Sequence, residues 1–175
     1  HELHTGNVTR SGTWYADSVP YVLDDYSASS GNVVIEIGST LTVQPGTVVK
    51  MDYGAGEVSL NVSGELLAAG TDANPIVFTS AADDRMPEGA AALSSHDTDG
   101  RDTLPAPAHW EGIHFNPGSA GELSHCFLRY GGQEGVGMVR LDRTGTNVRV
   151  RNCEIVDSDG DGVQVRGCSP EIMDT

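Results

Sequence analysis

The sequence predicts an all-β fold, a parallel β-solenoid made from a single chain. Three observations support this prediction. Short apolar alternations, broken by Gly, Asn, Asp and Ser, run through most of the 175 residues. Long helical patterns, with apolar residues at i, i+3, i+4 and i+7, are missing. A repeat with a period of 27 residues appears in the C-terminal half.

The strand-like segments are joined by bends rather than by hairpins. Asn-Gly hairpin turns are scarce, and Gly or Asn stands at each expected bend, as in the corners of a coil. The alternation is cleanest after residue 147, where Val148 and Val150 are expected to point inward while Arg149 and Arg151 point outward. The nine expected segments cover approximately residues 33–37, 41–51, 58–68, 75–80, 111–116, 122–130, 136–142, 147–156 and 162–174.

The repeat relates residues 124–130 to residues 151–157. Units of this length that cannot bury their own apolar face are typical of solenoids, in which like residues stack over like residues. Cys126 and Cys153 should therefore occupy adjacent inward positions, where cysteine acts as a small buried hydrophobe. With Cys168 the cysteines are odd in number, so a complete disulfide framework is excluded and the thiol states stay open.

The expected core residues are those that the alternation points inward. They are Val48, Leu60, Val62, Ile76, Phe78, Ile113, Phe115, Cys126, Leu128, Val148, Val150, Cys153, Ile155, Val163 and Val165.

Three motifs give the chain a resemblance to a known family. They are Trp14-Tyr15 with PYVL (20–23) and GSTLTVQPGTVVKM (38–51), then GELLAAGT (64–71) with NPIVFTS (74–80), then WEGIHF (110–115). Their order and spacing resemble the secreted bacterial and archaeal right-handed parallel β-helix repeat proteins, which have a pectate-lyase-like solenoid. The resemblance implies a single-stranded right-handed parallel β-helix over residues 31–175, an N-terminal capping segment over 1–30, and a non-enzymatic surface protein.

A long insertion over residues 81–110 interrupts the strand pattern and is rich in Pro, Ala and Asp. Its carboxylates at Asp97, Asp99 and Asp102 surround a glycine, and such spacing suits Ca²⁺. The resembling proteins often carry an Asp-rich loop here, preceded by a pair like Asp83-Asp84, although Arg101 stands where an acidic residue is usual. The alternative is a solvated loop that is hydrogen-bonded within itself.

A second acidic cluster contains Asp157, Asp159 and Asp161, followed by Gly162. This order matches the opening of an EF-hand loop and so also predicts Ca²⁺ binding. The twelfth position is Cys168, however, where a bidentate Glu belongs. The alternative is a solenoid corner, because Asp and Gly tolerate positive φ.

The formal net charge of −15 restricts the partners of the chain. Lys50 is the only lysine, and such an acidic surface repels nucleic acid and anionic membranes. An acidic surface attracts divalent cations and stays soluble in high salt. A role that is limited to keeping the solenoid soluble accounts for the acidic charge equally well. No apolar stretch approaches the roughly 20 residues that span a bilayer, so membrane insertion is not expected.

The expected location is extracellular, at a cell surface. His1 stands in place of Met, as in a mature protein whose export signal has been removed or in a segment of a longer chain. The sequons at Asn7 and Asn61 are usable glycosylation sites outside a cell.

The expected function is structural, with head-to-tail self-association into a fibre. The sequence stops inside a strand-like segment with Ile172 and Met173, and an uncovered strand edge templates pairing. Trp14, Tyr15 and Tyr21 of the N-terminal segment are the expected partners in a second copy. A boundary within a longer solenoid is the rival explanation.

Two other functions are weighed. A carbohydrate-binding or adhesive module, with a surface polysaccharide as its partner, requires exposed aromatic residues along one face. A polysaccharide lyase or hydrolase requires a carboxylate pair or calcium cluster beside a basic residue. Arg129, Arg149, Arg151 and Arg166 are outward candidates, but the catalytic motifs of polygalacturonase-like enzymes are absent. We therefore predict a protein that is not an enzyme.

Overall fold

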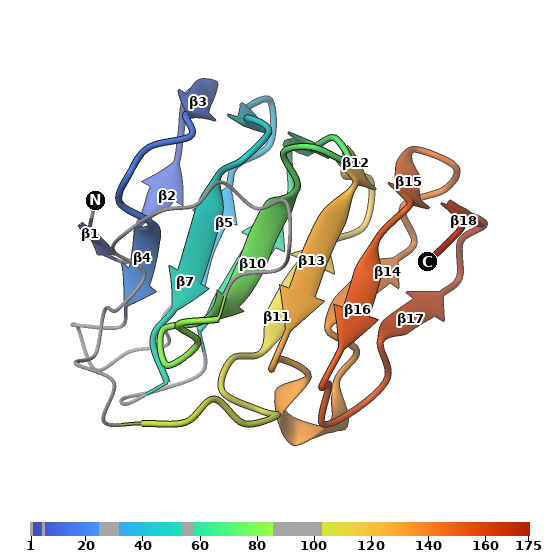
Figure 1. Ribbon diagram of the computed structural model, residues 1–175. Coiled ribbons are helices and arrows are strands. Elements are labelled where there is room, and N and C mark those ends of the chain that lie inside the picture. The colour runs from blue at the N-terminus through green and yellow to red at the C-terminus, as the bar shows by residue number, and fades with distance from the viewer. Residues whose placement is uncertain (1, 5, 25–31, 54–57, 86–102) are drawn as a thin grey trace.

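The computed structural model describes residues 2–4, 6–24, 32–53, 58–85 and 103–175 and shows a right-handed parallel β-solenoid (Figure 1). In these ranges, eighteen strands form three six-stranded parallel sheets, which enclose one interior. Each successive group of three strands, from β1–β3 to β16–β18, is one coil and adds one strand to every sheet. The coils are numbered 1 to 6, and one 3-10 turn, Gln133–Gly135, lies in coil 5.

The three sheets are named A, B and C. Sheet A contains β1 (Glu2–His4), β4 (Tyr21–Asp24), β7 (Val48–Met51), β10 (Ile76–Ser80), β13 (Cys126–Arg129) and β16 (Glu154–Val156). Sheet B contains β2 (Asn7–Val8), β5 (Asn32–Ile35), β8 (Ser59–Val62), β11 (Gly112–Phe115), β14 (Val139–Asp142) and β17 (Val163–Arg166). Sheet C contains β3 (Gly12–Trp14), β6 (Thr40–Val43), β9 (Glu65–Ala69), β12 (Ala120–Ser124), β15 (Val148–Arg151) and β18 (Glu171–Met173).

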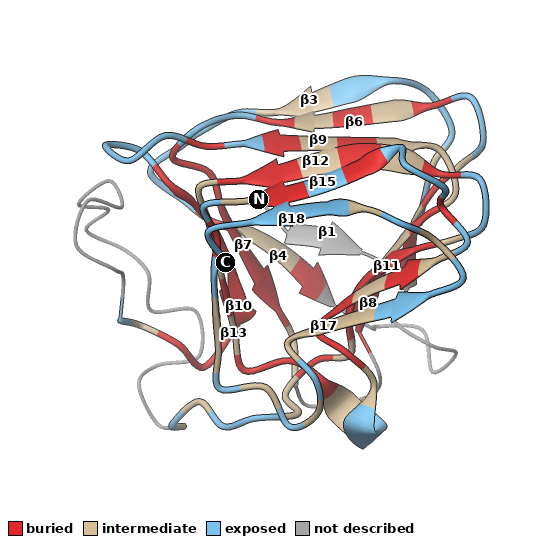
Figure 2. Ribbon diagram, turned by 90° about the vertical axis from the view of Figure 1, so that its right-hand side faces the viewer, coloured by how far each residue is buried: buried red, intermediate tan, exposed pale blue. Residues whose placement is uncertain are grey.

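The 27-residue repeat is the offset between coils 5 and 6 in sheet A. Phe127 pairs with Glu154 and Leu128 with Ile155, so Cys126 and Cys153 stack at the starts of their coils as predicted. Side chains alternate between the interior and the outer surface along each strand, which explains the apolar alternation in the sequence. Figure 2 shows the buried residues concentrated on the middle strands of each sheet.

Most of the predicted core is confirmed, with differences at four positions. Ile155 and Val163, in coil 6, are only half-buried and pack against the core. Val165 is 42% exposed because it lies on β17 in the last described coil, where no further coil covers it. Val48 is buried, but it does not belong to the interior cluster, because its neighbours Val49 and Met51 are the inward residues of β7. The outer face of sheet A is therefore also covered at this point.

Left-handed backbone conformations at the corners explain why nine predicted segments contain so many strands. His125 and Asn152 have φ of 47° and 51° and stack at the corner between sheets C and A. Tyr130 and Asp157, with φ of 63° and 55°, stack at the corner between sheets A and B. His125 and Asn152 each bend a segment that reads as one continuous strand, whereas Tyr130 and Asp157 stand where those two segments end. Non-glycine residues are uncommon in this conformation.

The predicted N-terminal segment contributes strands of its own. Coil 1 and β4 lie within residues 2–24, and the strands of coil 1 continue the parallel register of coil 2. Trp14 packs on the core and stacks on Tyr21, with ring centroids 5.1 Å apart. The predicted strands begin only at residue 33. The strands of coil 1 have two or three residues, too few to show an alternation, and β4 begins with three consecutive aromatic or apolar residues. No helix in the described ranges is long and apolar enough to cross a membrane.

Candidate functional site

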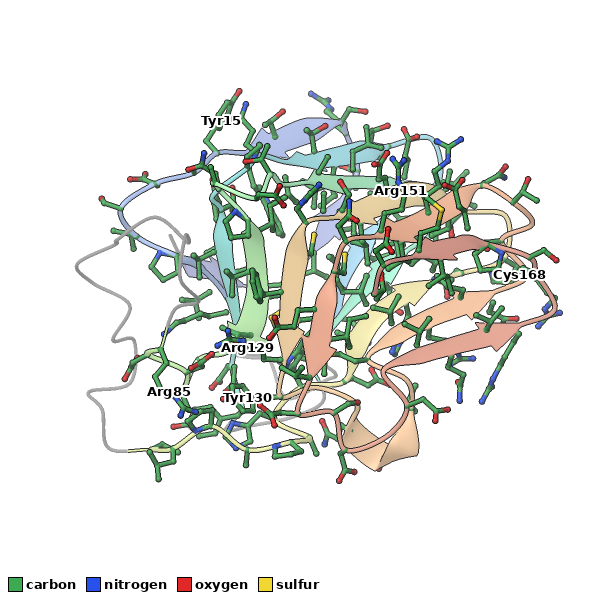
Figure 3. The ribbon with its side chains drawn as sticks, turned by 45° about the vertical axis from the view of Figure 1, so that its right-hand side comes forward. Tyr15, Arg85, Arg129, Tyr130, Arg151 and Cys168 are labelled. Carbon is green, nitrogen blue, oxygen red and sulfur yellow. The ribbon has the colours of Figure 1, made fainter. Side chains whose placement is uncertain are left out.

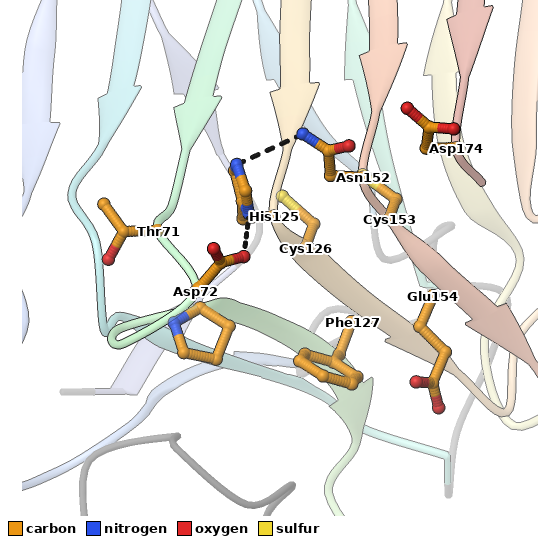
Figure 4. Close-up of a pocket in the computed structure, with 10 residues that line it drawn as sticks. Thr71, Asp72, His125, Cys126, Phe127, Asn152, Cys153, Glu154 and Asp174 are labelled. Atoms are coloured by element: carbon orange, nitrogen blue, oxygen red, sulfur yellow. Dashed lines mark hydrogen bonds and ion pairs between the residues drawn. The ribbon is translucent and has the colours of Figure 1, made fainter.

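A groove of about 330 Å³ opens at the corner between sheets C and A, beside coils 4 to 6 (Figure 4). We call it the corner groove. The stacking of successive coils brings its residues together, because each coil contributes the same corner position. It is lined by Thr71, Asp72, Pro75, His125, Cys126, Phe127, Asn152, Cys153, Glu154 and Asp174.

The polar side chains of the corner groove form a short chain of contacts. The Nδ1 atom of His125 lies 2.8 Å from a carboxylate oxygen of Asp72, and its Nε2 atom lies 3.2 Å from the Asn152 amide nitrogen. Asp72 is almost fully exposed, whereas the His125 ring is largely covered. Glu154 and Asp174 add further carboxylates, and the lining contains no Lys or Arg. The groove is therefore acidic and rich in hydrogen-bonding groups.

Two thiols lie in the wall of the corner groove. Cys126 and Cys153 are only 1% and 6% exposed. The Cys126 thiol lies 3.4 Å from the carbonyls of Ala68 and Ser124, and the Cys153 thiol donates to the Arg151 carbonyl at 3.3 Å. Burial, and next the neighbouring Cys153 side chain, raises the pKa of the Cys126 thiol well above its usual value. The neighbouring Cys126 side chain lowers the pKa of the Cys153 thiol, because it favours the thiolate there. The two cysteines therefore differ in chemical character although they share one environment.

A second constellation of charged residues, the buried charge cluster, lies where β10 and β13 reach the corner between sheets A and B. It consists of Lys50, Asp83, Asp84, Arg85 and Arg129, and Figure 3 shows Arg85 and Arg129 close to Tyr130. The carboxylate of Asp83 is fully buried. It accepts hydrogen bonds from the Thr79 hydroxyl at 2.8 Å and the Arg85 backbone N–H at 3.1 Å. Its oxygens lie 3.7 Å from Arg129 and 3.9 Å from Arg85.

Lys50 is the buried cation of this cluster. Its side chain projects from β7, is fully covered, and donates to the Ala81 carbonyl and to Asp84, each at 3.3 Å. A buried charge needs such partners because its desolvation is costly. Every charged group of the cluster therefore has a partner of opposite charge, as expected of a structural element.

The same corner also contains a serine and a histidine in contact. The Ser80 hydroxyl lies 2.8 Å from His109 Nδ1, and the His109 ring stacks on Tyr53 at 4.7 Å. A nucleophile with an adjacent base has this composition. Ser80 is fully buried, however, and its hydroxyl accepts a hydrogen bond from the Ala82 N–H. Burial lowers the pKa of His109, so the ring is held neutral and serves the packing of the corner.

Tyr130 completes this corner. Its hydroxyl accepts a 2.7 Å hydrogen bond from Arg85. Burial, together with the nearby carboxylate of Asp83, raises the pKa of the Tyr130 phenol. The phenol therefore stays protonated at neutral pH and is not prepared to act as a base.

The predicted calcium ligands lie in three places. Asp83 and Asp84 are in the buried charge cluster, paired with arginine and lysine. Asp97, Asp99 and Asp102 lie outside the described residues. Asp157 and Asp159 are exposed at the corner after β16, where Asp161 is also exposed and its carbonyl accepts from Ser158. In the described parts of the chain, no group of three or more His, Cys, Asp or Glu is arranged to hold a metal ion.

The predicted assembly residues differ in exposure. Trp14 and Tyr21 are half-buried and stacked, whereas Tyr15 is 59% exposed beside them. The Tyr15 backbone N–H donates to the Tyr21 hydroxyl at 3.0 Å. At the other end, Ile172 and Met173 are 41% and 47% exposed on β18. The structure thus places exposed aromatic and apolar groups at both ends of the solenoid.

The two sequons also differ. Asn7 is exposed on β2, where its amide donates to Glu36. Asn61 lies in the middle of β8 on the outer face of sheet B, is half-buried, and donates to Ser59 at 3.0 Å. Asn7 is therefore the more accessible of the two.

Charge pairs join neighbouring coils along the outer face of sheet C. Arg151 lies 2.5 Å from Glu122, and Arg149 lies 3.4 Å from Glu171. Each pair links adjacent strands of parallel register, as cross-strand partners do. These arginines, which were weighed as catalytic candidates, are thus engaged in contacts between coils.

His114 is the buried histidine on the outer face of sheet B. It is 6% exposed and stacks between Asn61 and Arg140 of the neighbouring coils. Burial and then the charge of Arg140 lower its pKa to about 4. Among the described residues its Nε2 atom has no hydrogen-bond partner.

Sequence reasoning missed the groups that carry the most chemistry. The contact between Asp72 and His125 joins different coils, and no local pattern shows it. The burial of Lys50 had a sequence signal, because the only lysine of an acidic chain stands among valines and methionine in residues 48–51. Comparison of the chain with protein-family models, with curated proteins and with solved structures finds no match.

Proposed function

We propose that this chain is a non-catalytic structural solenoid of a cell surface or extracellular fibre, and that it extends end to end. One observation carries the proposal. Val165 and Ile172 occupy inward positions, in register with Leu141 and Val150, yet they are 42% and 41% exposed. The apolar interior is thus open at coil 6, and another coil stacked there would bury both side chains.

Backbone groups at coil 6 support the same proposal. Within the described chain, β16, β17 and β18 each pair with a strand on one side only, and so do β1, β2 and β3 at the opposite end. Exposed strand edges pair readily with other strands. Coil 1 of a second copy offers three strands in the parallel direction, and this head-to-tail contact repeats without closing. Further coils of a longer polypeptide would cover the same edge, so the test must detect the second copy itself.

A non-catalytic role is supported by the charge pairing. Both arginines of the buried charge cluster are engaged with Asp83, and Arg149 and Arg151 are paired across coils. An extracellular location is supported by the exposed sequon at Asn7. We also propose that the protein binds calcium and a surface polysaccharide, the two ligands expected from the sequence.

Sedimentation velocity and negative-stain microscopy over a range of protein concentrations test this proposal. We expect rods whose length increases with concentration. The substitution Ile172→Lys should leave the protein monomeric, since it places a charge on the open interior. Ile37→Lys is the matched control, because Ile37 is 84% exposed and belongs to coil 2. A parent protein that stays monomeric at every concentration would rule out self-association.

Binding of a neutral oligosaccharide is a second candidate, favoured by the composition of the corner groove. Its carboxylates and the Asn152 amide are suitable partners for sugar hydroxyls, and Phe127 offers a half-buried aromatic ring. Calorimetric titration with oligosaccharides should give a signal that Asn152→Ala abolishes. Asn147→Ala, at an exposed position outside the groove, should leave it unchanged. Equal signals from both variants would dismiss the groove as a sugar site.

A further inference from the structure

The two cysteines of the corner groove are placed to form a covalent link between coils. Cys126 begins β13 and Cys153 directly precedes β16, and the pairing of Phe127 with Glu154 puts the two cysteines at the same height of adjacent coils. Adjacent strands of a sheet lie about 4.8 Å apart, a spacing that falls within the range of Cα separations found in disulfides. Both cysteines are free, and both line the corner groove.

We propose that Cys126 and Cys153 are a redox-active pair that a low-molecular-weight disulfide, such as oxidised glutathione, converts into an intramolecular disulfide joining coils 5 and 6. The corner groove supplies the route of access, because both cysteines line it and its volume of about 330 Å³ admits part of such a molecule. This inference does not depend on the proposed self-association.

The order of events follows from the difference between the thiols. Cys153 is the more exposed of the two and its pKa is lowered by Cys126, whereas burial raises the pKa of Cys126. The Cys153 thiolate attacks one sulfur of the small disulfide, whose S–S bond breaks and releases one small thiol. Cys126 then loses its proton and attacks the Cys153 sulfur, which releases the second small thiol. Two protein thiols are oxidised and one small disulfide is reduced.

Cys168 provides an internal control for this chemistry. It is half-buried near β14, and its thiol donates to the Leu141 carbonyl at 3.5 Å. It does not line the corner groove. An oxidation that does not select among the cysteines would therefore also modify Cys168. The proposed reaction leaves Cys168 reduced.

The experiment exposes the folded 175-residue chain to oxidised glutathione, then unfolds it in iodoacetamide and maps the tryptic peptides without reduction. Cleavage after arginine places the cysteines in separate peptides, 102–129, 152–166 and 167–175. We expect the first two peptides to be cross-linked and Cys168 to be alkylated. Cys168→Ser should form the same cross-link, and Cys153→Ser should form none.

Three results would overturn the inference. They are alkylation of both Cys126 and Cys153 after oxidation, a cross-link that involves Cys168, and a glutathione adduct that persists on Cys153. The last result would show that Cys126 does not resolve the mixed disulfide. Circular dichroism of each variant establishes that the chain under test is folded, and Cys126→Ser should accumulate the adduct on Cys153 that the parent protein does not retain.

Discussion

The carboxylate of Asp83 and the guanidinium of Arg129 lie 3.7 Å apart and belong to successive coils. Asp83 lies in the corner that follows β10, and Arg129 is the last residue of β13. Asp83 is fully buried, and it holds Arg85 and Thr79 in the same network. Because the chain between β10 and β13 is long, this contact ties two distant parts of the sequence. The buried charge cluster should therefore have a large influence on stability.

Replacing Asp83 with Asn should lower the free energy of unfolding by about 3 kcal/mol, because it leaves the charge of Arg129 poorly compensated. Urea denaturation followed by circular dichroism measures this loss. Asp142→Asn is the control, since Asp142 pairs with Arg143 at the solvent-exposed surface and its loss should be much smaller. Equal losses in the two variants would contradict a structural role for the buried cluster.

Stability should fall in acid through His114. The folded pKa of about 4 lies below the usual 6.5, so the unfolded chain binds more protons between these values. The stability that the neutral ring provides is present in full above pH 6.5 and is lost as the pH falls towards 4. A shift of this size corresponds to roughly 3 kcal/mol at most. Urea titrations at pH 7, 5.5 and 4 should show a steeper decline for the parent protein than for His114→Gln, and parallel declines would contradict this assignment.

Gly121 is a tight point of the interior. A Cβ atom there would lie 2.7 Å from the Phe115 ring and would overlap the Leu66 carbonyl. Gly121→Ala should therefore destabilise the fold by about 2 kcal/mol through overpacking. Gly12→Ala is the matched control, because its nearest neighbour would be 4.0 Å away. Thermal unfolding of both variants checks the prediction, which fails if they melt at the same temperature.

Calcium binding by the two Asp-rich segments stays a prediction. A ligand that binds only the folded state stabilises it by mass action, so added Ca²⁺ should raise the melting temperature and a chelator should reverse the rise. Substituting Asn at Asp97, Asp99 and Asp102 should remove more of the effect than substituting Asn at Asp159 and Asp161. A melting temperature that is the same with and without calcium would exclude calcium binding by both segments.

The sequence predicted the parts of the fold that depend on local periodicity. The inward positions of Val148 and Val150, and the stacking of Cys126 on Cys153, follow from alternation and from one visible repeat. Val165 shows the limit of this reasoning. Alternation correctly points its side chain inward, but only the neighbouring coil decides whether it is buried.

The candidate site was less predictable because its contacts join different coils. Asp72 meets His125, and Asp83 meets Arg129, only after the offset of every intervening coil is fixed. The predicted calcium pair at Asp83 and Asp84 illustrates the problem. The carboxylates were recognised from the sequence, but their cationic partners, Arg129 and Lys50, come from other strands and could not be.

The offset between β10 and β13 has a practical consequence for engineering. Ile76 pairs with Cys126, an offset of 50 residues, whereas Phe127 pairs with Glu154 at an offset of 27, and both pairings are in parallel register. The alignment of the strands thus does not depend on the number of residues in the corner after β10. A foreign peptide introduced at this corner should leave the sheets intact. In an end-to-end fibre of six-coil units, that peptide would recur about every 29 Å along the axis, so the protein would serve as a display scaffold with regular spacing.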